Sequence, residues 1–230
     1  MGFDSPSKKT PLNRLIDHTL LKADATGTQI AALCAEALTY RFASACVNAC
    51  WVREASRHLA GSGVPVAAVV GFPLGAMTTE AKSFEAAMAR DQGAQEVDVV
   101  INIGRLLGGE TSKVAADITA VVKAAAPASV KVIIECCLLS ESLKELAIGL
   151  VRDSGAAFVK TSTGFSTGGA TIDDVRLMRR LVGPNFGVKA AGGIRDLATA
   201  QAMVDAGANR LGTSAGVAIV RGLDAGVAEY

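Results

Sequence analysis

Short apolar runs alternate with longer amphipathic segments along almost the whole chain. The runs are rich in valine, isoleucine and alanine, as is typical of strands that are buried on both faces. The segments between them place apolar residues at helical spacing. Eight runs occur, at residues 15–19, 43–48, 64–72, 94–102, 129–136, 156–162, 186–192 and 208–214. The alternation therefore predicts eight strand–helix units.

Two of the amphipathic segments carry clear helix signals. In residues 78–92, Ala81, Phe84 and Met88 follow the i, i+3, i+7 spacing of one helical face. The segment 171–182 begins with acidic residues, which the helix dipole favours in the first turn. Glycines followed by alanine stand where three helices are expected to end: Gly93, Gly155 and Gly207.

The number and spacing of the units indicate the fold class. Eight units in 230 residues, without a long linker, predict a single (β/α)8 barrel over residues 1–230 with a short N-terminal extension. An open doubly wound sheet would give the same alternation. The barrel is favoured because no G-x-G-x-x-G motif follows the first run. Glycine-rich segments instead follow the seventh and eighth runs, where barrels bind phosphate.

The charge of the chain is nearly balanced, with 23 Lys and Arg against 22 Asp and Glu. A nucleic-acid or membrane-surface partner usually needs a basic excess, so we expect no nucleic acid and no membrane as partners. No apolar run approaches the roughly 18 residues of a membrane span. The N-terminal sequence MGFDSPSKKTPLNR also lacks the apolar segment of a secretory signal.

The cysteines and histidines bear on compartment and metal binding. The five cysteines are odd in number and form no C-x-x-C pair, which is typical of a cytoplasmic protein without disulfides. The two histidines, His18 and His58, are far apart and lack the spacing of metal ligands. We therefore expect no metal site, and we expect His18 to be structural.

Four charged residues lie within the apolar runs: Asp17, Asp98, Lys160 and Lys189. Catalytic groups of barrels stand at the carboxyl ends of strands, so these residues are the first candidates for chemistry. The plainer interpretation is buried ion pairs, because an unpaired charge inside a barrel costs several kcal/mol. Ion pairing explains one lysine and one aspartate well. It explains less well two lysines on neighbouring strands about 5 Å apart.

Two neighbouring lysines suggest a specific chemistry. Repulsion and burial both lower a lysine pKa from its usual value of about 10.4. A neutral lysine attacks a carbonyl and forms a Schiff base, which acts as an electron sink, as in a class I aldolase. Asp98 is placed to move protons in such a reaction.

Glycine-rich sequences after the last strands predict a phosphate site. AAGGI at 190–194 and LGTSAG at 211–216 each join a strand to a helix, so their N–H groups would hold an anion. Gly164 in TSTG would add a third N–H group. Glycines after strands are also ordinary turns, so either loop alone is weak evidence.

Other residues are weaker candidates. Lys131 and Glu135 lie four apart in VKVIIEC, and we expect them to pair in the barrel mouth. Cys46 and Asn48 end the second run and are expected to line the pocket, with Cys46 as a buried thiol. A terminal tyrosine is usually a frayed end, but a flexible tail would bring the phenol of Tyr230 to the mouth.

Taken together, the motifs resemble those of the deoxyribose-phosphate aldolase family. The matching segments, in chain order, are LIDHTLLK, CVN, VVGFPLGAMTTEAK, EVDVVIN, KVIIE, FVKTSTGF, KAAGGIR and GTSAGV. The resemblance implies a (β/α)8 barrel that reversibly cleaves 2-deoxy-D-ribose 5-phosphate to D-glyceraldehyde 3-phosphate and acetaldehyde, without metal or cofactor. Barrels of this kind are often dimers, so we expect a homodimer whose partner is a small sugar phosphate.

The same resemblance assigns roles to residues of this chain. Lys160 in FVKTSTG is the Schiff-base lysine, and Asp98 in EVDVV is the proton donor and acceptor. Lys189 in KAAGG perturbs Lys160 and helps to relay protons as a donor and acceptor. Asp17 in LIDHT is a supporting carboxylate near Lys189, and Tyr230 resembles a tail tyrosine that some members use in proton transfer. The positions that match the phosphate site are Gly164, Gly192, Gly193, Gly212 and Ser214.

The chain departs from the family pattern at positions outside these groups. Ala49 and Cys50 stand where a proline and an aromatic residue are expected, and Cys136 stands where threonine is expected. Phe165 replaces the lysine that some members carry. Two other functions stay open at this point: a sugar-phosphate isomerase or epimerase, which needs no imine, and a sugar-phosphate sensor that binds without turnover.

Overall fold

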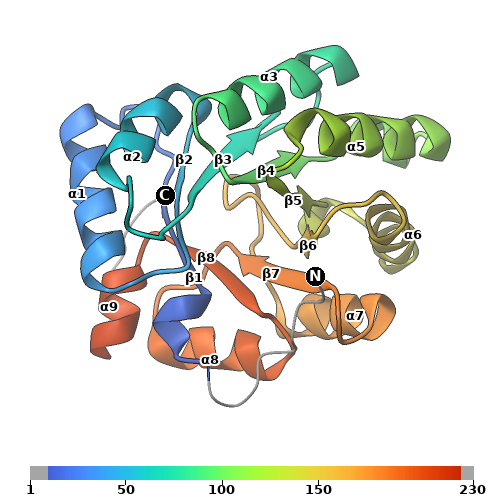
Figure 1. The fold of residues 1–230 in the computed structure, drawn as a ribbon. Helices are drawn as coiled ribbons and strands as arrows, with labels where there is room; N and C mark the ends of the chain where they lie inside the picture. Colours follow the sequence, from blue (N-terminus) through green and yellow to red (C-terminus); the bar gives the residue numbers. More distant parts are fainter. Residues whose placement is uncertain (1–9, 224–230) are drawn as a thin grey trace.

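Eight parallel strands close into a barrel in the computed structural model, which describes residues 10–223 (Figure 1). The strands are β1 (Ile16–Leu20), β2 (Ser44–Val47), β3 (Val66–Val70), β4 (Glu96–Val100), β5 (Ser129–Ile133), β6 (Phe158–Lys160), β7 (Gly187–Ala191) and β8 (Arg210–Thr213). Each strand pairs with the next in the sequence, and β8 returns to β1 with Asp17 opposite Gly212. This closure confirms the predicted (β/α)8 barrel and excludes the open sheet.

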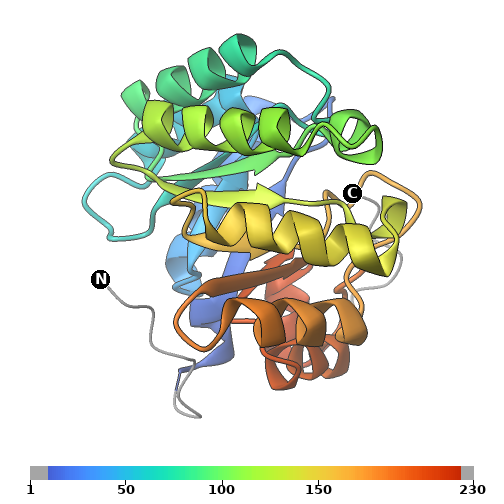
Figure 2. The same ribbon diagram turned by 90° about the vertical axis from the view of Figure 1, so that its right-hand side faces the viewer.

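Helices cover the outer face of the barrel (Figures 1 and 2). The α-helices are α1 (Gly27–Thr39), α2 (Val52–His58), α3 (Thr79–Asp91), α4 (Ile103–Leu107), α5 (Thr111–Ala125), α6 (Glu141–Arg152), α7 (Ile172–Val182), α8 (Leu197–Asp205) and α9 (Gly216–Arg221). Short 3-10 helices are η1 (Leu12–Leu15), η2 (Ala49–Trp51) and η3 (Cys136–Leu138). Within residues 10–223, no helix is long and apolar enough to cross a membrane.

The elements follow the predicted pattern closely. Each apolar run holds one strand, and the boundaries differ by three residues or fewer. The two helices predicted from their signals are α3 and α7, and the side chains of Thr78 and Thr171 cap their first turns. The first nine residues, which belong to the predicted N-terminal extension, and Tyr230 lie outside the described residues.

The apolar stripe that predicts α3 is not the face that the helix buries. Phe84 is 70% exposed and Met88 is 40% exposed, whereas Lys82, Ala86 and Ala89 are buried. The small alanines let the helix pack closely. The ammonium group of Lys82 donates to Asp117 Oδ2 at 2.7 Å and to the carbonyl of Val100 at 2.9 Å. The buried face of α3 therefore contains a lysine in an ion pair, where helical periodicity alone would favour an apolar side chain.

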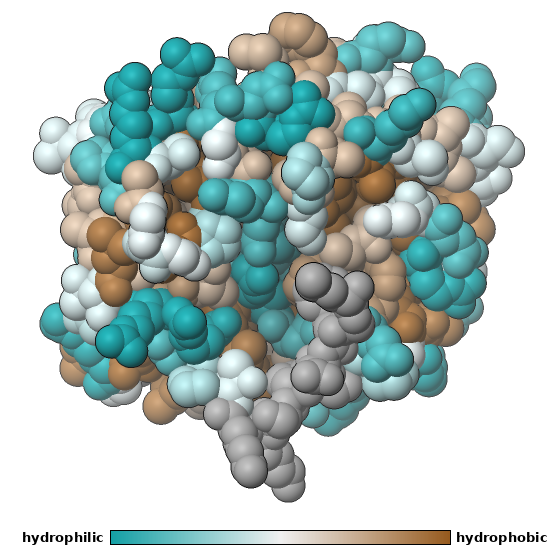
Figure 3. All heavy atoms as spheres, in the orientation of Figure 1, coloured by the Kyte–Doolittle hydropathy of each residue, from teal (hydrophilic) through white to brown (hydrophobic). Residues whose placement is uncertain are grey.

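The inside of the barrel has an apolar side and a charged side. On β2 and β3 the small side chains of Cys46, Ala67 and Val69 pack together with Leu21. The other strands send charged side chains inward. Hydrophilic side chains also gather at the centre of the barrel end shown in Figure 3. Because unpaired charges are costly to bury, the charged side chains inside the barrel must pair with one another. These pairs define the site.

Candidate active site

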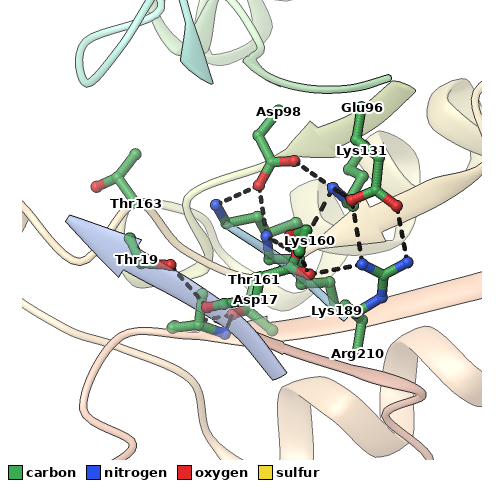
Figure 4. Close-up of polar contacts among 12 residues, drawn as sticks. Asp17, Thr19, Glu96, Asp98, Lys131, Lys160, Thr161, Thr163, Lys189 and Arg210 are labelled. Atoms are coloured by element: carbon green, nitrogen blue, oxygen red, sulfur yellow. Dashed lines mark hydrogen bonds and ion pairs between the residues drawn. The ribbon is translucent and has the colours of Figure 1, made fainter. Parts of the chain in front are cut away.

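Asp98 is the centre of a buried cluster of charged side chains (Figure 4). Its Oδ2 accepts a hydrogen bond from Lys160 Nζ at 2.8 Å and another from Lys189 Nζ at 2.6 Å. Its Oδ1 accepts one from Lys131 Nζ at 2.8 Å. One carboxylate therefore holds three lysines from three different strands.

The strand register brings these residues together. Lys160 on β6 lies opposite Lys189 on β7, and Asp98 on β4 lies opposite Lys131 on β5. Since side chains alternate along a strand, all four point into the barrel. Lys160 is the last residue of β6, so its amine stands at the carboxyl end of the barrel, where the β–α loops begin. The structure thus places the two predicted lysines side by side.

Asp17 lies against Lys189, as the family resemblance implies. Its Oδ2 accepts a hydrogen bond from Lys189 Nζ at 2.5 Å. Its Oδ1 accepts from Ser44 Oγ at 2.6 Å and from the guanidinium of Arg210 at 2.5 Å. Asp17 is therefore a second carboxylate that pairs with Lys189, in addition to Asp98.

The pKa shifts distinguish the two predicted lysines. Burial lowers the pKa of Lys160, and although Asp98 opposes this shift, the charge of Lys189 adds to it. Burial also disfavours charge on Lys189, but Asp17 and Asp98 together raise the pKa of Lys189 above its usual value. The pKa of Asp98 is held well below its usual value because the three lysines outweigh the effect of burial. Lys160 is therefore the lysine best suited to act as a free amine.

The predicted pair between Lys131 and Glu135 is wrong. β5 ends at Ile133, and Glu135 adopts a left-handed backbone conformation with φ +52°, so the strand alternation does not extend to it. Its carboxylate accepts hydrogen bonds from the backbone N–H of Thr163 at 3.2 Å and from Thr163 Oγ1 at 2.5 Å. Glu135 thus fixes the loop after Lys160, whereas Lys131 points into the charged cluster.

Sequence reasoning missed three members of this cluster: Glu96, Lys131 as a partner of Asp98, and Arg210. Lys131 Nζ lies 2.7 Å from Glu96 Oε2, and Arg210 lies 2.8 Å from Glu96 Oε1. Lys131 carried the same signal as Lys160, a lysine within an apolar run. Arg210 and Glu96 stand at strand beginnings, where a charge is ordinary, so their position gave no comparable signal.

The glycines of the β6–α7 and β7–α8 loops approach one another closely. A Cβ atom on Gly192, where φ is +87°, would lie 2.9 Å from Gly169 Cα and 3.4 Å from Gly164 Cα. A Cβ atom on Gly193 would meet no heavy atom within 4 Å. The loops are therefore in close contact at Gly192, and there is open space beside Gly193.

The remaining predicted phosphate positions lie within β8 and directly after it. Gly212 is inside the strand, and a Cβ atom there would lie 3.1 Å from Lys189 Cε. Packing therefore explains why glycine stands at position 212, since a side chain there would push against Lys189. Ser214 follows the end of β8 and is half-buried.

Cys46 and His18 have the predicted buried and structural surroundings, and Asn48 hydrogen-bonds the backbone. Cys46 is buried inside the barrel, and burial, with a contribution from Asp98, raises the pKa of its thiol. Asn48 donates to the carbonyl of Leu21 at 3.2 Å. His18 Nε2 lies 2.6 Å from Glu36 Oε2, on a helix outside the barrel, which fits a structural role.

Comparison with known proteins gives a consistent result. The sequence profile of the DeoC/LacD family aldolases matches residues 13–223. The deoxyribose-phosphate aldolase of Streptococcus pneumoniae serotype 19F (strain G54) is 58% identical over 211 residues, which cover 92% of this chain and 96% of that relative. The enzyme of the same name from Geobacillus sp. (strain WCH70) is 59% identical over 210 residues, with 91% and 94% covered.

Solved structures agree with the sequence relatives. A putative deoxyribose-phosphate aldolase from Coccidioides immitis superimposes with a TM-score of 0.89 at 43% identity, and the match covers 91% of this chain and 84% of that one. The deoxyribose phosphate aldolase from Aeropyrum pernix, described as a unique tetramer, gives a TM-score of 0.85 at 36% identity, with 91% and 89% covered.

Proposed function

Because this chain belongs to the DeoC/LacD aldolase family, we propose that it reversibly cleaves 2-deoxy-D-ribose 5-phosphate to D-glyceraldehyde 3-phosphate and acetaldehyde through a Schiff base on Lys160. The observation that carries the proposal is the contact of Lys160 and Lys189 with one oxygen of Asp98. Lys160 is the lysine of this pair whose pKa is lowered. Trapping of the imine with borohydride tests the proposal.

The reaction begins at the amine of Lys160. Neutral Nζ adds to the C1 carbonyl of the open-chain sugar, and loss of water from the carbinolamine gives the iminium. Asp98 lies within hydrogen-bond reach of Lys160, and Lys189 lies within reach of Asp98. These two residues therefore move the protons of these steps. Before substrate binds, Lys189 is protonated because it pairs with both Asp17 and Asp98.

Carbon–carbon cleavage follows from the iminium. The C3 hydroxyl loses its proton, the C2–C3 bond breaks, and its electron pair moves to C2 and the iminium to form an enamine. D-Glyceraldehyde 3-phosphate leaves as the new C3 carbonyl forms. Protonation of the enamine carbon and addition of water then release acetaldehyde and restore the free amine of Lys160. No step requires a metal or an organic cofactor, so we propose that the enzyme uses neither.

We assign the substrate phosphate to the loops that follow β6, β7 and β8. The support is the open space beside Gly193 and the positive φ of Gly164, Gly192 and Gly193, since only glycine adopts such a backbone freely. Backbone N–H groups of such loops bind anions well. The half-buried Ser214 adds a hydroxyl donor at the start of the β8–α9 loop.

Substitution of Gly192 by alanine tests this assignment. We expect KM for 2-deoxyribose 5-phosphate to rise about tenfold or more, because the methyl group forces the two loops apart and strains the backbone by about 1–3 kcal/mol. Steady-state kinetics measures the change. Gly63→Ala is the matched control: Gly63 has φ +75°, open surroundings and a place before β3. An unchanged KM in Gly192→Ala would place the phosphate elsewhere.

The rival functions are disfavoured by the same cluster. An isomerase or epimerase needs acid–base groups but no free amine, and reduction with borohydride in the presence of substrate would leave it active. A sensor without turnover has no use for a lysine whose pKa is lowered beside a second lysine. We also place the enzyme in the cytoplasm, since all five cysteines are free thiols.

We propose that the chain assembles as a homodimer through the exposed apolar face of α3. Phe84 and Met88 lie four residues apart on one face of this helix and are 70% and 40% exposed. Light scattering should give about twice the 23.5 kDa mass of the chain. The double substitution Phe84→Glu and Met88→Glu should reduce the mass to that of a monomer, whereas Leu146→Glu on α6 should not. A monomeric wild type would contradict the proposal.

A further inference from the structure

Lys131 is a fully buried lysine that the proposed reaction does not use. Its ammonium group lies 2.7 Å from Glu96 Oε2, 2.8 Å from Asp98 Oδ1 and 3.6 Å from Asp17 Oδ2. In the barrel register Lys131 on β5 lies opposite Phe158 on β6. Phe158 precedes Lys160 by two residues on that strand. Lys131 is therefore one layer deeper than Lys160, below the place where a substrate carbonyl would meet the amine.

The charges of the barrel interior do not balance when every group is ionised. Among residues 10–223, four cationic side chains, those of Lys131, Lys160, Lys189 and Arg210, face three carboxylates, those of Asp17, Glu96 and Asp98. Arg210 keeps its charge under all ordinary conditions. An uncompensated charge in a buried cluster is unfavourable, so the interior is neutral when one lysine is deprotonated.

The contacts decide which lysine is deprotonated. Lys189 touches two carboxylates, Asp17 and Asp98, and Lys131 touches two closely and a third at a longer distance. Of the carboxylates in the described part of the chain, Lys160 contacts Asp98 alone, through an oxygen that Lys189 also contacts. Loss of the proton from Lys160 therefore breaks the fewest ion pairs.

We propose that Lys131 is a positioning residue that supplies the counter-charge of Glu96 and of one oxygen of Asp98, so that Lys160 is held as a free amine. The proposal rests on the proposed role of Lys160 as the nucleophile. Lys131 itself does not touch the substrate. It acts through the charge count and through the orientation of Asp98, whose Oδ2 is left for Lys160 and Lys189 (Figure 4).

The buried carboxylate of Glu135, just beyond β5, accepts hydrogen bonds from Thr163 and forms no ion pair with the lysines of the cluster within residues 10–223. Groups from the other strands also leave the count unchanged. β2 contributes Cys46, whose thiol is neutral because burial raises its pKa, and β3 contributes the apolar Ala67 and Val69. The charged groups that face Lys160 or its partners are, strand by strand, Asp17 on β1, Glu96 and Asp98 on β4, Lys131 on β5, Lys189 on β7 and Arg210 on β8.

Lys131→Met tests the proposal directly. Methionine fills a similar space without charge. The interior then holds three cations and three carboxylates, so Lys160 keeps its proton. We expect the rising limb of the pH profile of kcat/KM to move to higher pH by about one unit or more, and imine trapping at pH 7 to fall about tenfold or more. Lys131→Arg, which keeps the charge, should retain the wild-type profile.

A second substitution separates the charge count from a loss of packing. Glu96→Gln added to Lys131→Met removes one cation and one anion together, so the rising limb should return toward its wild-type position. Glu96→Gln alone should move it to lower pH. Lys82→Met is the matched control, since Lys82 is also fully buried in an ion pair but lies outside the barrel. It should lower stability and leave the profile unchanged.

The outcomes distinguish this inference from the proposed function. A wild-type enzyme that forms no imine with 2-deoxyribose 5-phosphate would overturn the proposed function and the inference with it. An active wild type together with a folded Lys131→Met variant of unchanged pH profile would overturn the inference alone. If Lys131→Met does not fold, the Glu96→Gln variant tests the charge count instead. A shift of the rising limb of its kcat/KM profile to lower pH supports the charge count, and an unshifted limb overturns it.

Discussion

Replacement of Lys160 by methionine is expected to abolish turnover of 2-deoxyribose 5-phosphate. We expect kcat to fall by at least about 10⁴-fold, because removal of a covalent nucleophile leaves only binding and electrostatic effects. The substitution also removes just one of the ion pairs of Asp98, which keeps Lys131 and Lys189 as partners, so the barrel should still fold. A coupled assay for D-glyceraldehyde 3-phosphate measures the loss.

Borohydride reduction identifies the residue that forms the imine. With the wild type and substrate, peptide mass mapping should find the adduct on Lys160, and the variant should give none. Lys144→Met is the matched control, since Lys144 pairs with Asp174 at 2.6 Å on the outside of the barrel. It should keep both activity and trapping. An active Lys160→Met variant would refute the imine mechanism, and an adduct on Lys189 would exchange the roles of the two lysines.

Asp98→Asn is expected to lower both catalysis and stability. The amide cannot accept and return protons, so we expect kcat to fall about 10²- to 10⁴-fold. Lys131, Lys160 and Lys189 also lose the carboxylate they share. Removal of one partner from a buried ion cluster typically costs about 3–5 kcal/mol. Steady-state kinetics and denaturant unfolding measure the two effects.

The pH dependence of stability gives an independent check on Asp98. The lysines hold the pKa of Asp98 well below its usual value in the folded chain. Its carboxylate therefore contributes stability above the value of about 3.9 at which aspartate titrates in an unfolded chain. That contribution is lost as the pH falls from there through the folded-state pKa. The stability difference between wild type and Asp98→Asn should be largest near neutral pH and should shrink in acid.

Asp117→Asn separates stability from catalysis. Asp117 is buried on α5 and accepts a hydrogen bond from Lys82 Nζ at 2.7 Å, outside the barrel interior. Its substitution should lower the free energy of unfolding without changing kcat. If Asp98→Asn behaves in the same way, with wild-type kcat, Asp98 has only a structural role.

The barrel and its two facing lysines could be predicted from the residue pattern alone. Strand and helix periods are local properties, so eight apolar runs and the helices between them follow from spacing alone. Lys160 and Lys189 occupy equivalent places in neighbouring runs, and parallel pairing sets them opposite each other. Asp98 and Asp17 could be chosen because a charge inside such a run needs a partner.

Only the tertiary structure decided which charges pair and which helical face is buried. The sequence predicts that Lys131 pairs with Glu135 along one strand, but it pairs with Asp98 and Glu96 because the barrel sets the register between strands. α3 buries Lys82 rather than Phe84 because Asp117 and the Val100 carbonyl, distant in sequence, receive its ammonium group. The energy of a buried charge depends on all neighbours at once. Those neighbours come from several strands, so no local pattern in the chain contains them.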